Sequence, residues 1–88
     1  MNKYLLVYSD SLGSREQIKE ALNSMSEVVH WRFDMPNSFY IYSDSTAKEL
    51  LEKIRTMRGG TGRCIMVKMD QYYGWLPNST WEFFKKHD

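Results

Sequence analysis

The chain has 88 residues, of which 42% are hydrophobic, 15% aromatic and 26% charged. This length supports one modest core, and this composition excludes global disorder, so we predict a single domain over residues 1–88. The net charge of +1 excludes nucleic-acid binding through overall charge, and one cysteine excludes an intrachain disulfide. No apolar run is long enough for a signal peptide or a membrane span, so we expect a cytoplasmic location.

The first half of the chain has the pattern of a strand, a helix and a second strand. Residues 4–8 are apolar on both alternating faces, which is typical of a central strand. Ser14 and Gln17 form a capping-box pattern, and apolar residues follow at helical spacing. Residues 27–33 alternate as a half-buried antiparallel strand does, and a turn over 34–37 predicts a hairpin to the next strand.

The second half of the chain repeats the order strand, helix, strand. Residues 38–43 form the third predicted strand, and any of Asp44, Ser45 and Thr46 is a suitable cap for the helix that follows. Two glycines at 59–60 end that helix, and residues 63–70 form the fourth strand. The complete order predicts an α+β fold, a ferredoxin-like βαββαβ sandwich with a four-stranded antiparallel sheet and two helices on one face.

Residues 74–88 form a distinct aromatic tail. Ser79 and Glu82 have capping-box spacing and predict a short C-terminal helix. We expect the tail to pack on the open edge or exposed face of the sheet, either on its own chain or on a second copy. Because two helices cover only one face of a sheet, the uncovered face predicts a homodimer. The predicted interface residues are Tyr8, Trp75, Leu76, Trp81 and Phe84.

Few residues carry the pattern of a chemical site. Asp10 directly follows the first strand, where a dimer would bring two carboxylates together to hold Mg²⁺ as catalytic and metal-binding residues. The alternative interpretation is that Asp10 forms a turn. His30 and His87 are far apart in the sequence, which disfavours a histidine triad or zinc site. Cys64 lies in a strand pattern, where a free thiol is expected to be inert.

A basic segment surrounds the glycine-rich loop before the fourth strand. Arginines beside flexible backbone are suited to phosphate binding, but a helix C-terminus precedes this loop and has the wrong dipole for anions. The alternative is a helix stop with solvated arginines, so binding to nucleic acid is not expected to be tight. The candidate nucleic-acid or anion-binding residues are Arg55, Arg58, Arg63 and Lys68.

A family resemblance rests on two features of the sequence. The first predicted strand ends in Tyr8-Ser9-Asp10, and a helix, a hairpin and a second helix that ends in Gly59-Gly60 follow it. The chain resembles the small ferredoxin-like superfamily that contains the CRISPR adaptation endonuclease-like protein and VapD-type ribonuclease toxins. The resemblance implies a dimer with the strand-one aspartate at its interface and a C-terminal segment that crosses onto the partner. Ser9 here separates the tyrosine from the aspartate, which in that superfamily are usually adjacent.

Three functions remain open from the sequence. The first is a small dimeric interaction module of a mobile element or defence system, with an unknown protein partner, no catalysis and no cofactor. The second, implied by the resemblance, is a metal-dependent endonuclease or ribonuclease toxin that uses paired Asp10. The third is a ferredoxin-like regulatory domain that binds a small ligand between protomers.

Overall fold

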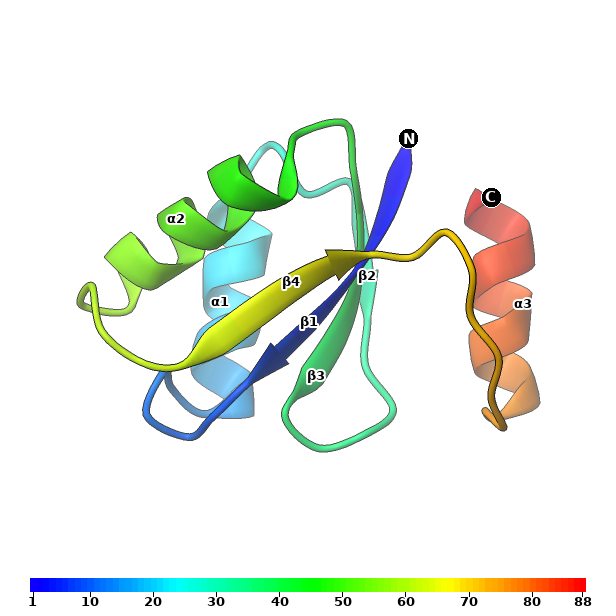
Figure 1. The fold of residues 1–88 in the computed structure, drawn as a ribbon, viewed down its shortest axis with the longest axis horizontal. Coiled ribbons are helices and arrows are strands. Elements are labelled where there is room, and N and C mark those ends of the chain that lie inside the picture. The colour runs from blue at the N-terminus through cyan, green and yellow to red at the C-terminus, as the bar shows by residue number, and fades with distance from the viewer.

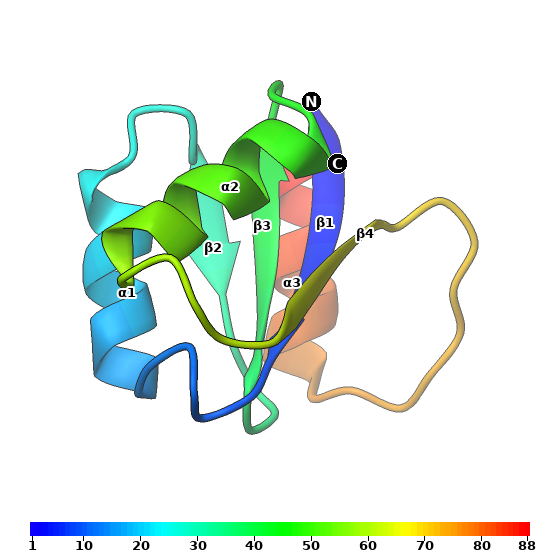
Figure 2. The ribbon, with the colours of Figure 1, turned by 60° about the vertical axis from the view of Figure 1, so that its left-hand side comes forward.

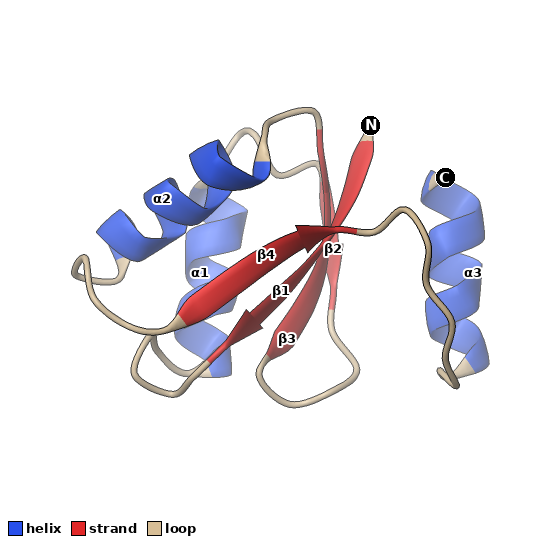
Figure 3. Ribbon diagram, viewed as in Figure 1, coloured by secondary structure: helices blue, strands red, loops and turns tan.

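A computed structural model describes all of residues 1–88 and contains four strands and three helices (Figures 1 and 3). The strands form one antiparallel sheet in the order β2-β3-β1-β4, so the predicted α+β class is confirmed, and this order is consistent with a ferredoxin-like sandwich. No helix combines the length and the apolar character that crossing a bilayer requires. In chain order the elements are β1 (Asn2–Tyr8), α1 (Arg15–Ser24), β2 (His30–Arg32), β3 (Ser38–Ser43), α2 (Ala47–Met57), β4 (Cys64–Lys68) and α3 (Asn78–His87).

Local sequence signals set the ends of the first two helices. The predicted capping box of Ser14 and Gln17 is present, with reciprocal hydrogen bonds of 3.2 and 2.9 Å. Thr46, one of three candidate caps, forms the equivalent box with Glu49 at the start of α2. At the end of α2, Gly59 and Gly60 have φ values of 94° and 80°, which a residue with a Cβ adopts only with strain.

The main core lies between one face of the sheet and helices α1 and α2. Both helices lie on the same side of the sheet in Figure 2. Fully buried apolar side chains come from every layer of this sandwich, which accounts for its cohesion. They include Leu6 of β1, Ile18 of α1, Phe39 and Ile41 of β3, and Ile54 of α2.

Helix α3 lies on the opposite face of the sheet, so the aromatic tail docks on its own chain (Figure 1). Phe84 packs against Tyr40 of β3, with ring centroids 5.0 Å apart. The predicted capping box of Ser79 and Glu82 is wrong. The helix begins at Asn78, so the N-cap residue is Pro77, whose side chain has no acceptor. The Ser79 hydroxyl lies inside the helix and accepts a hydrogen bond from Arg32.

Two strands are shorter than predicted. β2 has three residues rather than the seven expected, because the chain first makes a turn in which Val28 N donates to Met25 O (3.1 Å). β4 ends at Lys68, although Met69 N still donates to Lys3 O (2.8 Å). The sheet consequently has a short edge strand, β2, and a longer one, β4.

Candidate interaction surface

One half of the sheet face beside α3 remains uncovered. Helix α3 contacts β2 and β3 through Arg32, Tyr40 and their neighbours, whereas β1 and β4 carry exposed valine and isoleucine side chains on this face. We call these three residues the β4 strip: Val7, Ile65 and Val67, which are 42%, 58% and 47% exposed. Exposed apolar side chains gathered in one place on a small domain are typical of an interaction surface.

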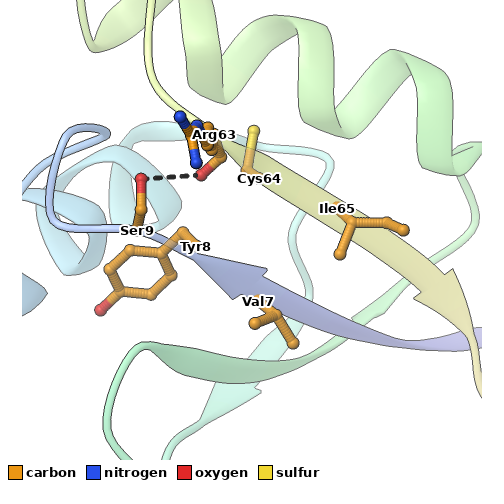
Figure 4. Close-up of a pocket in the computed structure, with 6 residues that line it drawn as sticks. All are labelled: Val7, Tyr8, Ser9, Arg63, Cys64 and Ile65. Atoms are coloured by element: carbon orange, nitrogen blue, oxygen red, sulfur yellow. Dashed lines mark hydrogen bonds between the residues drawn. The ribbon is translucent and has the colours of Figure 1, made fainter.

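The strip is continuous because Val7 and Ile65 face each other across the sheet and Val67 follows on the same face of β4. Val7 lies directly opposite Ile65 in the β1–β4 ladder, and Leu5, which is half-buried, lies opposite Val67. Figure 4 shows Val7 and Ile65 side by side at a shallow depression of about 410 Å³. The depression is lined by Val7, Tyr8, Ser9, Arg63, Cys64 and Ile65.

The Cys64 thiol at this depression is not activated. Burial raises its pKa, and the nearby Arg55 charge opposes this only in part. A thiol with a raised pKa remains protonated at neutral pH and is a poor nucleophile. The expectation of an inert cysteine is therefore supported by the direction of the pKa shift.

The free edge of β4 presents unpaired backbone groups. Ser9 N donates to Arg63 O (3.0 Å) and Met69 N donates to Lys3 O (2.8 Å), at the two ends of the ladder. Because backbone groups on an antiparallel strand alternate in direction, the odd-numbered residues of β4 turn theirs toward β1. The residues that turn their N–H and C=O groups to the open edge are Cys64, Met66 and Lys68. No other element of the chain pairs with this edge.

The loop between β4 and α3 adds two exposed aromatic side chains. Tyr73 and Trp75 are 86% and 85% exposed, and their rings meet edge to face with centroids 5.1 Å apart. Beneath this loop lies a small apolar cavity of about 160 Å³, lined by Leu5, Met69 and other apolar residues. The exposed aromatic pair therefore adjoins the sheet face on which the β4 strip lies.

The predicted interface residues divide into buried and exposed groups. Tyr8 is 5% exposed and stacks on Phe39 in the main core, and Phe84 is 3% exposed beneath α3. Leu76 and Trp81 pack at the margin of the α3 cluster, whereas Trp75 is free in solvent. Of the five, Trp75 alone is largely exposed to a partner, and the β4 strip was not among the residues selected from sequence.

A polar network holds the first turn of α3 against the hairpin between β2 and β3. Thr80, fully buried, accepts a hydrogen bond from Arg32 Nε (3.0 Å) and donates one to Asp34 Oδ2 (2.6 Å). Tyr40 donates to the other oxygen of Asp34 (3.3 Å). Burial, reinforced by the Asp34 charge, raises the pKa of Tyr40 to about 12. Asp34, expected from sequence to be a turn former, thus links the hairpin to the tail.

A second network holds the last turn of α3. The Asp88 carboxylate accepts hydrogen bonds from Tyr42 (2.5 Å) and from Lys3 Nζ (2.9 and 3.0 Å), and Lys3 also contacts the Tyr72 hydroxyl. Burial alone raises the pKa of Asp88, but these hydrogen bonds outweigh it and hold the pKa below its ordinary value. Burial and the Asp88 charge raise the pKa of Tyr42. The tail is therefore fastened to the sheet at both ends.

Asp10 is engaged in a turn. Asn37 Nδ2 donates to Asp10 Oδ1 and to Tyr8 O, both at 2.9 Å, and the Asp10 carbonyl accepts from Gly13 N (3.1 Å). No group of three His, Cys, Asp or Glu side chains is arranged to hold a metal ion. These contacts support the interpretation of Asp10 as a turn former, although its carboxylate remains exposed.

The four basic candidates do not converge on one point. Arg55 donates to Gly60 O and Arg58 Nε donates to Leu12 O, both at 3.1 Å, so these two side chains hold backbone. Arg63 precedes β4 and Lys68 ends it, which separates them by about 17 Å along an extended strand. That separation is too large for both to grip a single phosphate.

Comparison with family models, with curated proteins and with solved structures found no match to this chain. The resemblance to the superfamily of CRISPR adaptation and VapD-type proteins is therefore still a prediction.

Proposed function

We propose that this protein is a small interaction module that acts as a homodimer, with β4 of one copy pairing antiparallel to β4 of the second. The observation that supports this most strongly is the apolar β4 strip beside a free strand edge. An exposed apolar edge strand is a template for pairing with another strand. Natural monomers usually protect such an edge with charges, prolines or a covering element, and β4 has none of these between residues 64 and 67.

The backbone of β4 is compatible with pairing about a two-fold axis at Met66. In that register Met66 lies opposite Met66 of the second copy, and Cys64 lies opposite Lys68. In this register Cys64, Met66 and Lys68, whose N–H and C=O groups point to the open edge, occupy the hydrogen-bonded positions of the new ladder. All the unpaired N–H and C=O groups of the strand would be satisfied.

The side chains of β4 are also self-complementary in this register. Ile65 lies opposite Val67 of the second copy at a non-hydrogen-bonded position, where side chains approach most closely. Across residues 62–70 no charged residue lies opposite another. The two β4 strips join into one apolar surface, which favours a second copy of this chain over an unrelated strand.

The expected affinity is modest. A stable dimer usually buries about 800 Å² on each partner, and a five-residue strand with a short apolar strip provides less than that on its own. Tyr73 and Trp75 enlarge the contact if they lie over the second copy. We therefore expect dissociation in the micromolar range.

The proposal is one of binding rather than catalysis. Asp10 is engaged by Asn37, the Cys64 thiol has a raised pKa, and the basic side chains are dispersed. These features support the interaction module over the nuclease and small-ligand alternatives. A role in a mobile element or defence system remains a prediction from the resemblance alone.

Light scattering coupled to size exclusion tests the proposal. At a protein concentration of about 100 μM or more, well above a micromolar dissociation constant, the mass should approach twice the monomer mass of 10.5 kDa. Val67→Lys should shift the protein to monomer, because it places a charge in the joined apolar surface. The matched control is Val29→Lys, since Val29 is also a valine, is 49% exposed and lies beside the opposite sheet edge. A monomeric wild type, or equal effects of the two substitutions, would contradict the proposal.

A further inference from the structure

Two histidines that are distant in sequence meet where the end of α3 reaches the sheet. The rings of His30 on β2 and His87 on α3 stack with centroids 3.6 Å apart and an interplanar angle of 26°. Their separation along the chain does not predict this contact, which follows from the docking of α3 on the sheet. Phe83 and Tyr42 surround the His87 ring, with centroids 4.8 and 5.6 Å from it.

The surroundings of this histidine stack are predominantly cationic. The one carboxylate close to it, that of Asp88, is already engaged by the Lys3 ammonium and the Tyr42 hydroxyl. A proton added to the stack therefore has no free anion beside it. The charged and titratable groups on this side of the elements packed here are Glu82, Lys85 and Lys86 of α3, Asp88 directly after it, Arg32 of β2, Tyr40 and Tyr42 of β3, Lys3 of β1 and Tyr72 of the tail.

Stacking suits neutral imidazoles and not two imidazolium ions. Two positive charges at this separation repel each other, and they do so more strongly at a partly buried site than in bulk water. Burial, together with the charges of His30 and Lys86, lowers the pKa of His87, while Asp88 acts in the opposite direction. When the pKa of a histidine is lower in the docked state, protonation opposes docking. Docking is therefore strongest above the ordinary histidine pKa of about 6.5, and it weakens as the pH falls below that value.

Helix α3 forms a unit apart from the main core. Its side chains belong to a separate cluster around Tyr40, Tyr42 and Phe84, on the other side of the sheet from α1 and α2. A peripheral unit of this kind opens locally while the rest of the domain remains folded. Opening α3 would expose the aromatic face formed by the two tyrosines.

We propose that the His30–His87 stack is an acid-sensitive latch, and that its protonation releases α3 from the sheet while the main core stays folded. This device lies on β2 and α3, away from the β4 strip, so it does not depend on the proposed dimer. It would convert a covered aromatic face into an exposed one over the pH range in which histidine titrates.

Amide hydrogen exchange of the whole protein tests the latch. Between about pH 7.5 and 5.5, one unit either side of the ordinary histidine pKa, protection of the α3 amides should fall, by at most about tenfold for each histidine that must gain a proton. Protection is calculated relative to unstructured peptide at the same pH. The β3 amides should retain theirs, since β3 belongs to the main core. Constant α3 protection, or a parallel loss in β3, would overturn the proposal.

Two substitutions separate protonation of the stack from other effects of acid. His30→Phe retains a stacking ring that gains no charge and leaves a single histidine to be protonated, so the loss of α3 protection at the lower pH should be smaller than in the wild type. Lys85→Gln removes a charge from an exposed position of α3 and should leave the acid response as in the wild type. If His30→Phe fails to dock α3 even at the higher pH, His87→Phe replaces it as the same test. A response to acid in the docked phenylalanine variant that is as large as in the wild type would overturn the latch.

Discussion

Phe84 is the residue on which docking of the tail most depends. Its side chain is 3% exposed and meets the rings of Tyr40, Tyr72 and Trp81 edge to face, with centroids 5.0, 5.9 and 5.7 Å away. The ammonium of Lys3 lies 4.3 Å from the Phe84 ring centroid. We predict that Phe84→Ala detaches α3 and lowers stability without unfolding the main core.

The size of the effect follows from the area that the ring buries. A buried aromatic side chain removes about 150–250 Å² from water, which at about 25 cal/mol per Å² corresponds to about 4–6 kcal/mol. Measured costs of Phe→Ala in cores are about 3–5 kcal/mol. Once α3 has detached, the substitution cannot lower the free energy of unfolding by more than the free energy with which α3 docks. We therefore expect a decrease at the low end of this range, about 3 kcal/mol.

Urea denaturation followed by circular dichroism measures this loss, and amide exchange locates it. The matched control is Trp75→Ala, which removes a larger aromatic side chain that is 85% exposed and should change stability by less than about 0.5 kcal/mol. The reasoning is refuted if Phe84→Ala leaves α3 protected from exchange, or if the two substitutions cost the same.

Three further predictions concern the contacts that hold the fold. Thr80→Val keeps the side-chain shape but removes the hydroxyl that both Asp34 and Arg32 bind. The free energy of unfolding in urea should fall by about 1–3 kcal/mol. An unchanged urea midpoint would contradict the network. Gly62→Ala should lower the free energy of unfolding by about 1–3 kcal/mol, because Gly62 has φ 105° and an added Cβ would lie 2.7 Å from Leu12 Cα. Thermal melting should show a lower midpoint. An unchanged midpoint would contradict the close approach of the two backbones. The lowered pKa of Asp88 contributes stability that is present above about pH 3.8 and is lost as the pH falls through the lowered value; Asp88→Asn should remove this part of the acid dependence, and an identical pH profile would argue against it.

The order of strands and helices along the chain, and the ends of the first two helices, could be predicted because local signals determine them. The capping box at Ser14 and the glycines after α2 act through neighbouring residues, so the sequence alone contains what they need. The length of β2 could not be predicted, because a turn hydrogen bond from Val28 competes with strand pairing. Alternation shows that a residue can lie in a strand and does not show where pairing begins.

The site was harder to predict because its contacts join distant parts of the chain. Docking of the tail on its own sheet depends on Thr80 reaching Asp34 and on Asp88 reaching Lys3, and no spacing rule contains these pairs. The exposure of Ile65 depends on which half of the sheet α3 covers. The alternating apolar residues of the fourth strand were visible, but their exposure on an edge was not.

Disulfide cross-linking tests the proposed β4 pairing most directly. In the two-fold register Cys64 lies opposite Lys68 of the second copy, and hydrogen-bonded antiparallel pairs have Cα atoms about 5.5 Å apart, a separation that a disulfide spans. Under mild oxidation Lys68→Cys should give a covalent dimer whose linked peptides join Cys64 of one copy to position 68 of the other. Lys48→Cys, at an exposed position of α2, should not link to Cys64. A Lys68→Cys protein that stays monomeric, or that cross-links no more than the Lys48→Cys control, would contradict the pairing.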